Sequence, residues 1–320
     1  RSTEQVAYGT VPTHSEPTKD GYTFTWWDPE VVAVTGEATY TAQWTANTYK
    51  VVFHANDEGA TWTMSDQTFT YDEPNKALTA NEFSKVGYTF AGWAKSTDGV
   101  VMYTNGQLVH NLTTEQNGVV NLYAKWTINS HTITFNMNGH GIQIDPITQN
   151  YWTSITAPAD PTEEGYTFGG WYTDNTTFQD EYDIPSTMPD ADATVYAKWT
   201  VNTHTVSYNM NGHGEQEESV SVNYGAEIPQ PNVDNVTWYT FGGWTLTNGD
   251  AVPSTMPDTD VELKAAWTVN THAVSYNMNG RGTQVASTTV NYGAEIPQPE
   301  VDDVTWYTFE GWTLSNGDAV

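Results

Sequence analysis

Short stretches of alternating apolar and polar residues run along the chain and predict β-strands. Residues 205–210 alternate in this way, as does a strand with one buried face. Asn211-Gly212 follows directly, and both residue types accept the positive φ angles of a hairpin turn. Residues 220–224 alternate again. The pattern therefore predicts an opening strand, a hairpin turn and a return strand.

The residues that follow predict two more strands and an extended connection. Residues 227–231 contain two prolines, which remove backbone donors and fix φ, so this crossover is expected to be extended rather than a long helix. The aromatic stretch 238–244 is predicted to be the central strand, and its Gly242-Gly243 pair predicts a bulge or a close backbone approach that re-aims Trp244. Residues 261–267 alternate as a closing strand.

The same series of patterns recurs, so the chain is a tandem array of similar modules. Each copy has an aromatic block, Gly-Tyr-Thr-Phe or Trp-Tyr-Thr-Phe, most often followed by Gly-Trp, and most copies end on a strand that closes with tryptophan. The repeated positions that define the motif are Tyr88, Phe90, Gly92, Trp93, Tyr123, Trp126, Tyr166, Phe168, Gly170, Trp171, Tyr196, Trp199, Tyr239, Phe241, Gly243, Trp244, Trp267, Tyr307, Phe309, Gly311 and Trp312. We interpret these residues as structural, because a module of about 70 residues needs large aromatic side chains to build a core.

The repeats predict the division of the chain into modules. Three whole modules are predicted at 49–130, 131–203 and 204–271. Partial modules are predicted at 1–48, which lacks the first strand, and at 272–320, which lacks the last strand. Each whole module is expected to hold four to five strands and little helix. The best helix candidate is Lys76 to Phe83, in the longest module.

These motifs resemble the Listeria-Bacteroides repeat, also called the internalin B repeat. GYTFGGW at 165–171 and YAKW at 196–199 carry the resemblance most specifically, and it extends over nearly the whole chain. It implies β-grasp-like modules arranged as an elongated array on secreted or cell-surface proteins, usually as spacer or stalk segments of adhesins. Trp238 and Trp306 replace the leading glycine of the motif, and Lys264 replaces its closing tyrosine. We expect these departures to affect local turn geometry rather than the fold.

The composition excludes several classes of function. The chain has 10 Lys+Arg against 39 Asp+Glu, a formal net charge of −29, so it disfavours nucleic acid and anionic membrane surfaces. It contains no cysteine, which excludes disulfides, thiolate metal sites and a cysteine nucleophile. No apolar stretch is long enough to span a bilayer, so direct membrane insertion of this segment is not expected.

The search for chemistry yields no catalytic, cofactor-binding or metal-binding residue, and we expect no enzyme activity. The acidic loops Asp190-Ala191-Asp192 and Asp258-Thr259-Asp260 offer oxygen ligands for calcium, but they lack the distal glutamate of an EF-hand, which favours solvated carboxylates. His131, His204 and His272 recur where one module follows another. They are predicted to be junction contacts or exposed polar residues, and a histidine at the junction would make it sensitive to pH.

The sequence therefore predicts an extracellular, acidic stalk that acts as a semi-rigid spacer. The linker 200–203 is short and β-prone, which leaves adjacent modules little freedom. The alternative is that the repeats are themselves adhesive, with other copies of the chain or cell-surface glycan as partners. Trp62, Trp152 and Trp26-Trp27 lie outside the repeat pattern and would stack on sugar rings if exposed, although packing between modules is the simpler interpretation. Exposed strand edges would allow a filament.

Overall fold

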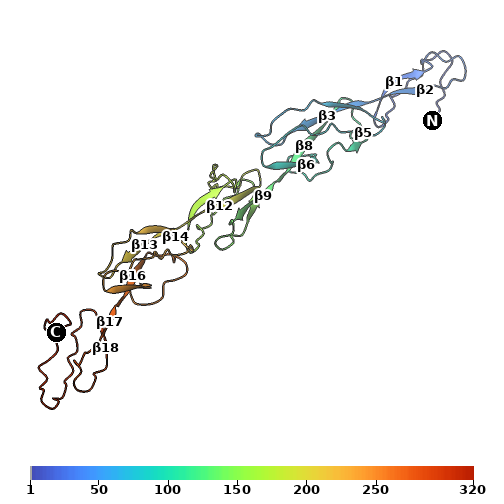
Figure 1. Cartoon of the computed structure of the whole chain (residues 1–320). Helices are drawn as coiled ribbons and strands as arrows, with labels where there is room; N and C mark the ends of the chain where they lie inside the picture. Colours follow the sequence, from blue (N-terminus) through green and yellow to red (C-terminus); the bar gives the residue numbers. More distant parts are fainter. Residues whose placement is uncertain (1) are drawn as a thin grey trace. The chain divides into compact units, whose positions relative to one another are not determined.

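The computed structural model describes residues 2–320, and these residues form strands, turns and loops (Figure 1). The strands are β1 (Tyr22–Asp28), β2 (Thr41–Ala46), β3 (Thr48–His54), β4 (Gln67–Thr70), β5 (Lys76–Ala77), β6 (Tyr88–Ala94), β7 (Leu108–Val109), β8 (Gly118–Ile128), β9 (Ser130–Asn136), β10 (Ile147–Asn150), β11 (Tyr166–Tyr172), β12 (Ala193–Val201), β13 (Thr203–Asn209), β14 (Val220–Asn223), β15 (Tyr239–Leu246), β16 (Val261–Val269), β17 (Thr271–Val274) and β18 (Thr288–Asn291). Across residues 2–320 there is no helix of the length and apolar character needed to cross a membrane.

The helix predicted at Lys76 to Phe83 is wrong. Lys76–Ala77 form the short strand β5, which pairs with β7, and the residues after it are extended or irregular. Leu78 and Phe83 are buried in the core that also holds Trp93. These two apolar side chains fix an extended segment to the core, whereas a stable helix needs a longer apolar stripe.

The chain divides into two compact units. The first comprises Arg1–Asn136, Ile144–Ala159 and Asp180–Tyr196, and the second comprises Met137–Gln143, Asp160–Gln179 and Ala197–Val320. Strand β12 contains residues of both units.

Three four-stranded sheets share one strand order. They are β4-β3-β8-β6, β10-β9-β12-β11 and β14-β13-β16-β15. In each, the opening strand pairs antiparallel with the return strand and parallel with the closing strand. In the first and third, the aromatic strand pairs antiparallel with the closing strand. The fold is therefore mainly β, built from mixed sheets that repeat along the chain.

The aromatic strand lies at the edge of its sheet, so its predicted central place is wrong. In the third sheet the closing strand β16 lies between the opening strand β13 and the aromatic strand β15. The predicted bulge is confirmed, because the register of β15 against β16 shifts between Phe241 and Trp244. Bulges are common on edge strands, where they limit pairing with further chains, so the glycine pair was a signal for an edge.

The number of strands is as expected in two of the three whole modules. Modules 131–203 and 204–271 have four strands each, whereas module 49–130 has six, because β5 and β7 form an additional two-stranded sheet. The predicted turn at Asn211-Gly212 is confirmed, with φ angles of 53° and 84°. The crossover after β14 contains no helix, as its prolines predict. Strands β1 and β2 form one two-stranded sheet, and β17 and β18 form another.

Candidate functional site: the junctions between modules

The motif phenylalanines and tryptophans lie together in the cores. Phe90 lies between Trp93 and Trp126, with ring centroids 4.9 and 5.8 Å away. The corresponding distances are 5.3 and 5.5 Å for Phe168 with Trp171 and Trp199, and 5.4 and 5.4 Å for Phe241 with Trp244 and Trp267, while Phe309 lies 5.2 Å from Trp312. Each closing tryptophan donates its indole N–H to a backbone carbonyl, and Trp267 Nε1 lies 2.9 Å from the oxygen of Met210. These residues therefore close the core.

The motif tyrosines lie apart from these tryptophan cores. Tyr166 and Tyr239 contact the rings of His140 and His213, which follow the hairpin turns, at 4.1 and 4.0 Å. Tyr307 packs under Arg281, whose guanidinium carbon lies 3.4 Å from the ring centroid. Tyr123 and Tyr196 lie on the closing strands β8 and β12. Gly92, Gly170, Gly243 and Gly311 have positive φ angles, and Gly92 and Gly243 lie at the register shifts of β6 and β15.

One asparagine connects consecutive sheets at each of four junctions. These residues are Asn47, Asn129, Asn202 and Asn270, and sequence reasoning did not single them out. The backbone N–H of Asn202 donates to Gly165 O at 2.8 Å, and its carbonyl accepts from the N–H of Tyr224 at 2.8 Å. Its Oδ1 accepts from Thr167 Oγ1 at 2.7 Å. The recurrence of an asparagine between consecutive modules was the sequence pattern that could have identified these connectors.

The same three contacts recur at the other junctions, which makes the asparagine a repeated connector. The asparagine N–H to glycine or tryptophan O distances are 2.9, 2.9 and 2.7 Å for Asn47, Asn129 and Asn270. The threonine hydroxyl to Oδ1 distances are 2.6, 2.7 and 2.7 Å for Thr23, Thr89 and Thr240. Both the backbone and the side chain of one residue therefore tie the aromatic strand of one module to the opening strand of the next.

A tyrosine ring of the following module packs on the first residue of the aromatic block. Gly21, Gly87 and Gly165 have φ angles of 75–77°, and a Cβ added at Gly165 would lie 2.0 Å from Cδ1 of Tyr224. The corresponding distances are 2.2 Å from Tyr71 at Gly21 and 1.8 Å from Tyr151 at Gly87. Glycine is required here for two reasons, the left-handed backbone and the absence of space for any side chain.

The tryptophans that replace this glycine keep its backbone conformation. Trp238 and Trp306 have φ angles of 74° and 76°, so the expected change in local turn geometry does not extend to the φ angle of this residue. Trp238 stacks on Tyr292, with ring centroids 4.2 Å apart and planes inclined by 4°. The left-handed strain of a bulky residue is offset there by aromatic stacking across the junction.

An aspartate of the following module completes two junctions. Asp258 accepts from Asn202 Nδ2 at 2.9 Å and from the Gly165 N–H at 3.3 Å, and His204 Nε2 lies 2.7 Å away. The hydrogen bond from Asn202 contributes most, followed by that from His204, to holding the pKa of Asp258 below its ordinary value. Asp190 has the same partners in Gly87, Asn129 and His131, and its pKa is likewise lowered, chiefly by the Gly87 N–H.

The acidic loops considered for calcium are occupied by contacts within the chain. Asp192 and Asp260 accept the N–H groups of Thr132 and Thr205, each at 2.8 Å. Among residues 2–320 no group of three or more His, Asp or Glu side chains is arranged to hold a metal ion. His131 and His204 pair with aspartates of their own modules, so they support the junctions through Asp190 and Asp258, which accept the N–H groups of Gly87 and Gly165. His272 instead lies edge-on to Trp238 at 6.1 Å.

Comparison with known proteins places these repeats in a sequence family. The family model described as the Listeria-Bacteroides repeat domain matches residues 49–125, 131–198, 204–268 and 272–319. A protein of Evansella cellulosilytica with the provisional name Gly-rich membrane protein is 31% identical over 280 residues, covering 86% of this chain and 32% of that protein. Internalin H of Listeria monocytogenes is 30% identical over 192 residues, covering 52% of this chain and 34% of internalin H. The chain thus spans about a third of the length of these relatives.

Proposed function

Because the chain belongs to the Listeria-Bacteroides repeat domain family, we propose that it is a non-enzymatic, semi-rigid spacer in an extracellular or cell-surface protein. The names of the relatives, a membrane protein and an internalin, support an extracellular or cell-surface location. Since the chain spans about a third of their length, other parts of such proteins would carry the anchor and the terminal binding domain.

The observation that carries the proposal is the repeated junction. Hydrogen bonds from one asparagine, packing of a tyrosine on the aromatic block and, at two junctions, the hydrogen bonds accepted by an aspartate restrict rotation between consecutive sheets. A flexible linker would leave these groups solvated and the modules free to turn. The spacer mechanism is additive, because each module adds its own length and one restricted junction.

The β-grasp character of the modules is part of the same proposal. A parallel pair formed by the first and last strands, with an antiparallel neighbour on each side, supports it in modules 49–130 and 204–271. The family resemblance supports it as well. A high-resolution experimental structure of one whole module would test it, and a strand order other than return, opening, closing and aromatic would contradict it.

Small-angle scattering with light-scattering mass, over a concentration series, tests the spacer. A compact protein of 320 residues would have a radius of gyration of about 20 Å. The spacer predicts a clearly larger value at a constant monomer mass of 35.5 kDa. A radius near the compact value would contradict it. The variant Asn202→Ala is expected to broaden the distribution of dimensions, whereas the control Asn223→Ala, in the exposed part of β14, is expected to leave them unchanged.

Adhesion by the repeats is a second candidate, favoured by the exposure of several indoles. Trp62 is 75% exposed, Trp152 is 70% exposed and Trp26 is 59% exposed. Packing between modules therefore does not explain why these three indoles are exposed. Mass that grows with concentration in the same scattering series would support self-association, and a shift of tryptophan fluorescence with added polysaccharide would support glycan binding.

A further inference from the structure

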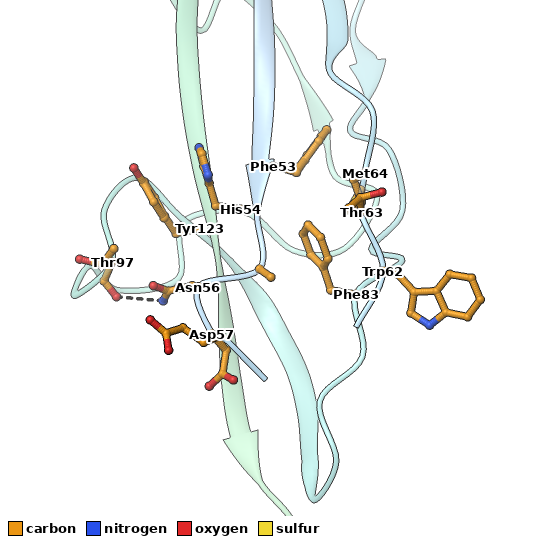
Figure 2. A pocket seen from close by; sticks show the side chains of 12 residues that line it. Phe53, His54, Asn56, Asp57, Trp62, Thr63, Met64, Phe83, Thr97 and Tyr123 are labelled. Carbon is orange, nitrogen blue, oxygen red and sulfur yellow. Dashed lines mark hydrogen bonds between the residues drawn. The ribbon is translucent and has the colours of Figure 1, made fainter. Parts of the chain in front are cut away.

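Module 49–130 has a groove at the end of strand β3, with a volume of about 680 Å³. Phe53, His54, Asn56, Asp57, Trp62 and Tyr123 are among the residues that line it. Figure 2 shows His54 and Tyr123 on one side and Trp62 on the other, with the indole directed away from Phe83. The groove therefore offers two separate aromatic surfaces to a ligand.

The groove depends on residues that the other whole modules lack. The connection from β3 to β4, residues 55–66, contains Trp62, whereas the corresponding connections 137–146 and 210–219 are shorter and contain no tryptophan. His54 is paired in register with Tyr123, and their rings stack at 4.6 Å with planes inclined by 16°. The equivalent pairs are Asn136 with Tyr196 and Asn209 with Lys264, so the two-ring stack is specific to module 49–130.

Trp62 has a strained backbone conformation that is not offset by contacts of its side chain within the chain. Its φ angle is 77°, a left-handed conformation that is strained for a bulky residue. Its side chain is 75% exposed, so burial does not offset the strain. Trp238, by comparison, has the same backbone conformation but stacks on Tyr292. Among the described residues Trp62 has no aromatic partner, and strained residues of this kind concentrate at binding sites.

The polar groups of the groove are held in fixed positions. Asn56 Nδ2 donates to the carbonyl oxygens of Thr97 and Ala124, both at 3.1 Å. His54 Nε2 lies 2.8 Å from Asn121 Oδ1. Asp57 is paired with Lys85, and the hydrogen bond from this ammonium keeps the pKa of Asp57 below its ordinary value. Fixed polar groups beside aromatic rings are typical of small-ligand sites.

The charges select among ligand classes. Asp57 and Glu58 line the groove and the chain carries a net charge of −29, which disfavours anionic ligands. Lys85 pairs with Asp57, so the groove does not present a cluster of unpaired carboxylates: among the described residues that line it, Glu58 is the carboxylate without an ion pair. Carboxylate and amide oxygens remain good acceptors for hydroxyl donors. A ligand with flat apolar faces and many hydroxyl groups fits this combination.

We propose that the groove binds a neutral oligosaccharide, with one sugar face on the His54–Tyr123 stack and another on Trp62. This inference deepens the adhesive candidate and is independent of the spacer role. A spacer that carries one binding module would attach along its length as well as hold other domains at a distance.

The test measures binding of the full chain to soluble polysaccharides by native affinity electrophoresis and calorimetry. The probes are two neutral polymers, a β-1,3-glucan and an α-mannan, together with anionic alginate. Retardation by at least one neutral polymer, and not by alginate, is expected. Failure of both neutral polymers to bind, or binding of alginate alone, would overturn the proposal.

Variants locate the site. Trp62→Ala is expected to weaken binding about tenfold or more, the loss of one stacked ring. The control Trp152→Ala removes an indole that is also exposed and left-handed but lies outside the groove, and is expected to change affinity less than about twofold. His54→Asn combined with Tyr123→Lys introduces the pair found in module 204–271, so the fold should tolerate it while binding is lost. Equal loss in the Trp152 variant, or unchanged binding in the Trp62 variant, would refute the placement. Scattering dimensions are expected to stay the same in all variants, which separates this result from the spacer test.

Discussion

Replacing Gly165 by alanine tests whether the junction requires glycine for space or only for its backbone conformation. The φ angle of Gly165 is +75°, and a Cβ there would lie 2.0 Å from Cδ1 of Tyr224. Gly225 is a matched control in the same unit, because its φ angle is +74° and a Cβ there would meet nothing within 4 Å. The two substitutions share the backbone cost and differ in the collision with the ring.

The two effects differ in their physical origin and have sizes typical of such changes. A left-handed alanine costs about 1–2 kcal/mol, which is the whole effect expected for Gly225→Ala. Gly165→Ala adds an overpacking cost of about 1–3 kcal/mol, because the Tyr224 ring has to leave its position. At Trp238, where the bulkier residue is natural, the tyrosine ring stacks on the indole at 4.2 Å, which shows one arrangement that relieves such a collision.

Amide hydrogen exchange on the full chain measures the destabilisation of the junction in each of the two variants. The N–H groups of Asn202 and Tyr224 both form junction hydrogen bonds, at 2.8 Å each. If the junction opens independently, an added cost of about 1–3 kcal/mol lowers their protection by roughly 5- to 150-fold relative to Gly225→Ala. Adding Tyr224→Ala should remove most of this difference, since the double mutant has no ring to displace. Equal protection in Gly165→Ala and Gly225→Ala would refute the argument that the ring excludes a side chain.

Three further predictions concern the cores and the junction charges. Trp93→Phe is expected to lower the free energy of core opening, measured by amide exchange, by about 1–2 kcal/mol less than Trp244→Phe does. The reason is that the buried Trp93 N–H has no partner in the described structure, whereas the Trp244 N–H donates to a carbonyl at 2.8 Å. The pKa values of Asp190 and Asp258 are lowered, so the contribution of these carboxylates is present above the ordinary value of 3.8 and is lost as the pH falls through the lowered values. Junction protection, corrected for intrinsic exchange, should therefore fall as the pH drops below 3.8. Asn202→Asp should lower junction protection by placing two carboxylates together, and adding Asp258→Asn should restore part of it, whereas no restoration would contradict the pairing.

The sequence predicted the parts of the fold that depend on local patterns. Alternation marked the opening and closing strands, and Gly242-Gly243 marked the bulge, because strand pleat and positive φ are properties of a few neighbouring residues. The edge position of the aromatic strand could not be derived in this way. It depends on the closing strand β16 inserting between β13 and β15, a pairing between residues distant in the chain.

The junction could be predicted only in part from the sequence, because its contacts also join residues that are distant in the chain. The recurrence of His131 and His204 indicated a contact, but not that Asp190 and Asp258 would be the partners. The constant linker asparagine is a small polar residue in a β-prone segment, and such residues are common in loops. Its role depends on partners from the aromatic strand of one module and from the end of the return strand of the next, which become neighbours only when consecutive sheets are formed.

The distribution of junction residues explains how the modules can differ in length and still connect. Module 204–271 supplies Tyr224, His204 and Asp258 to the junction before it and Trp238, Thr240 and Asn270 to the junction after it. The additional sheet β5-β7 and the groove of module 49–130 arise from residues outside this set. Duplication of one module therefore copies the contacts for both of its ends, and insertions elsewhere leave them unchanged. The near identity of residues 204–252 and 272–320 fits growth by this route, since a copied module can join its neighbours without new contacts having to evolve.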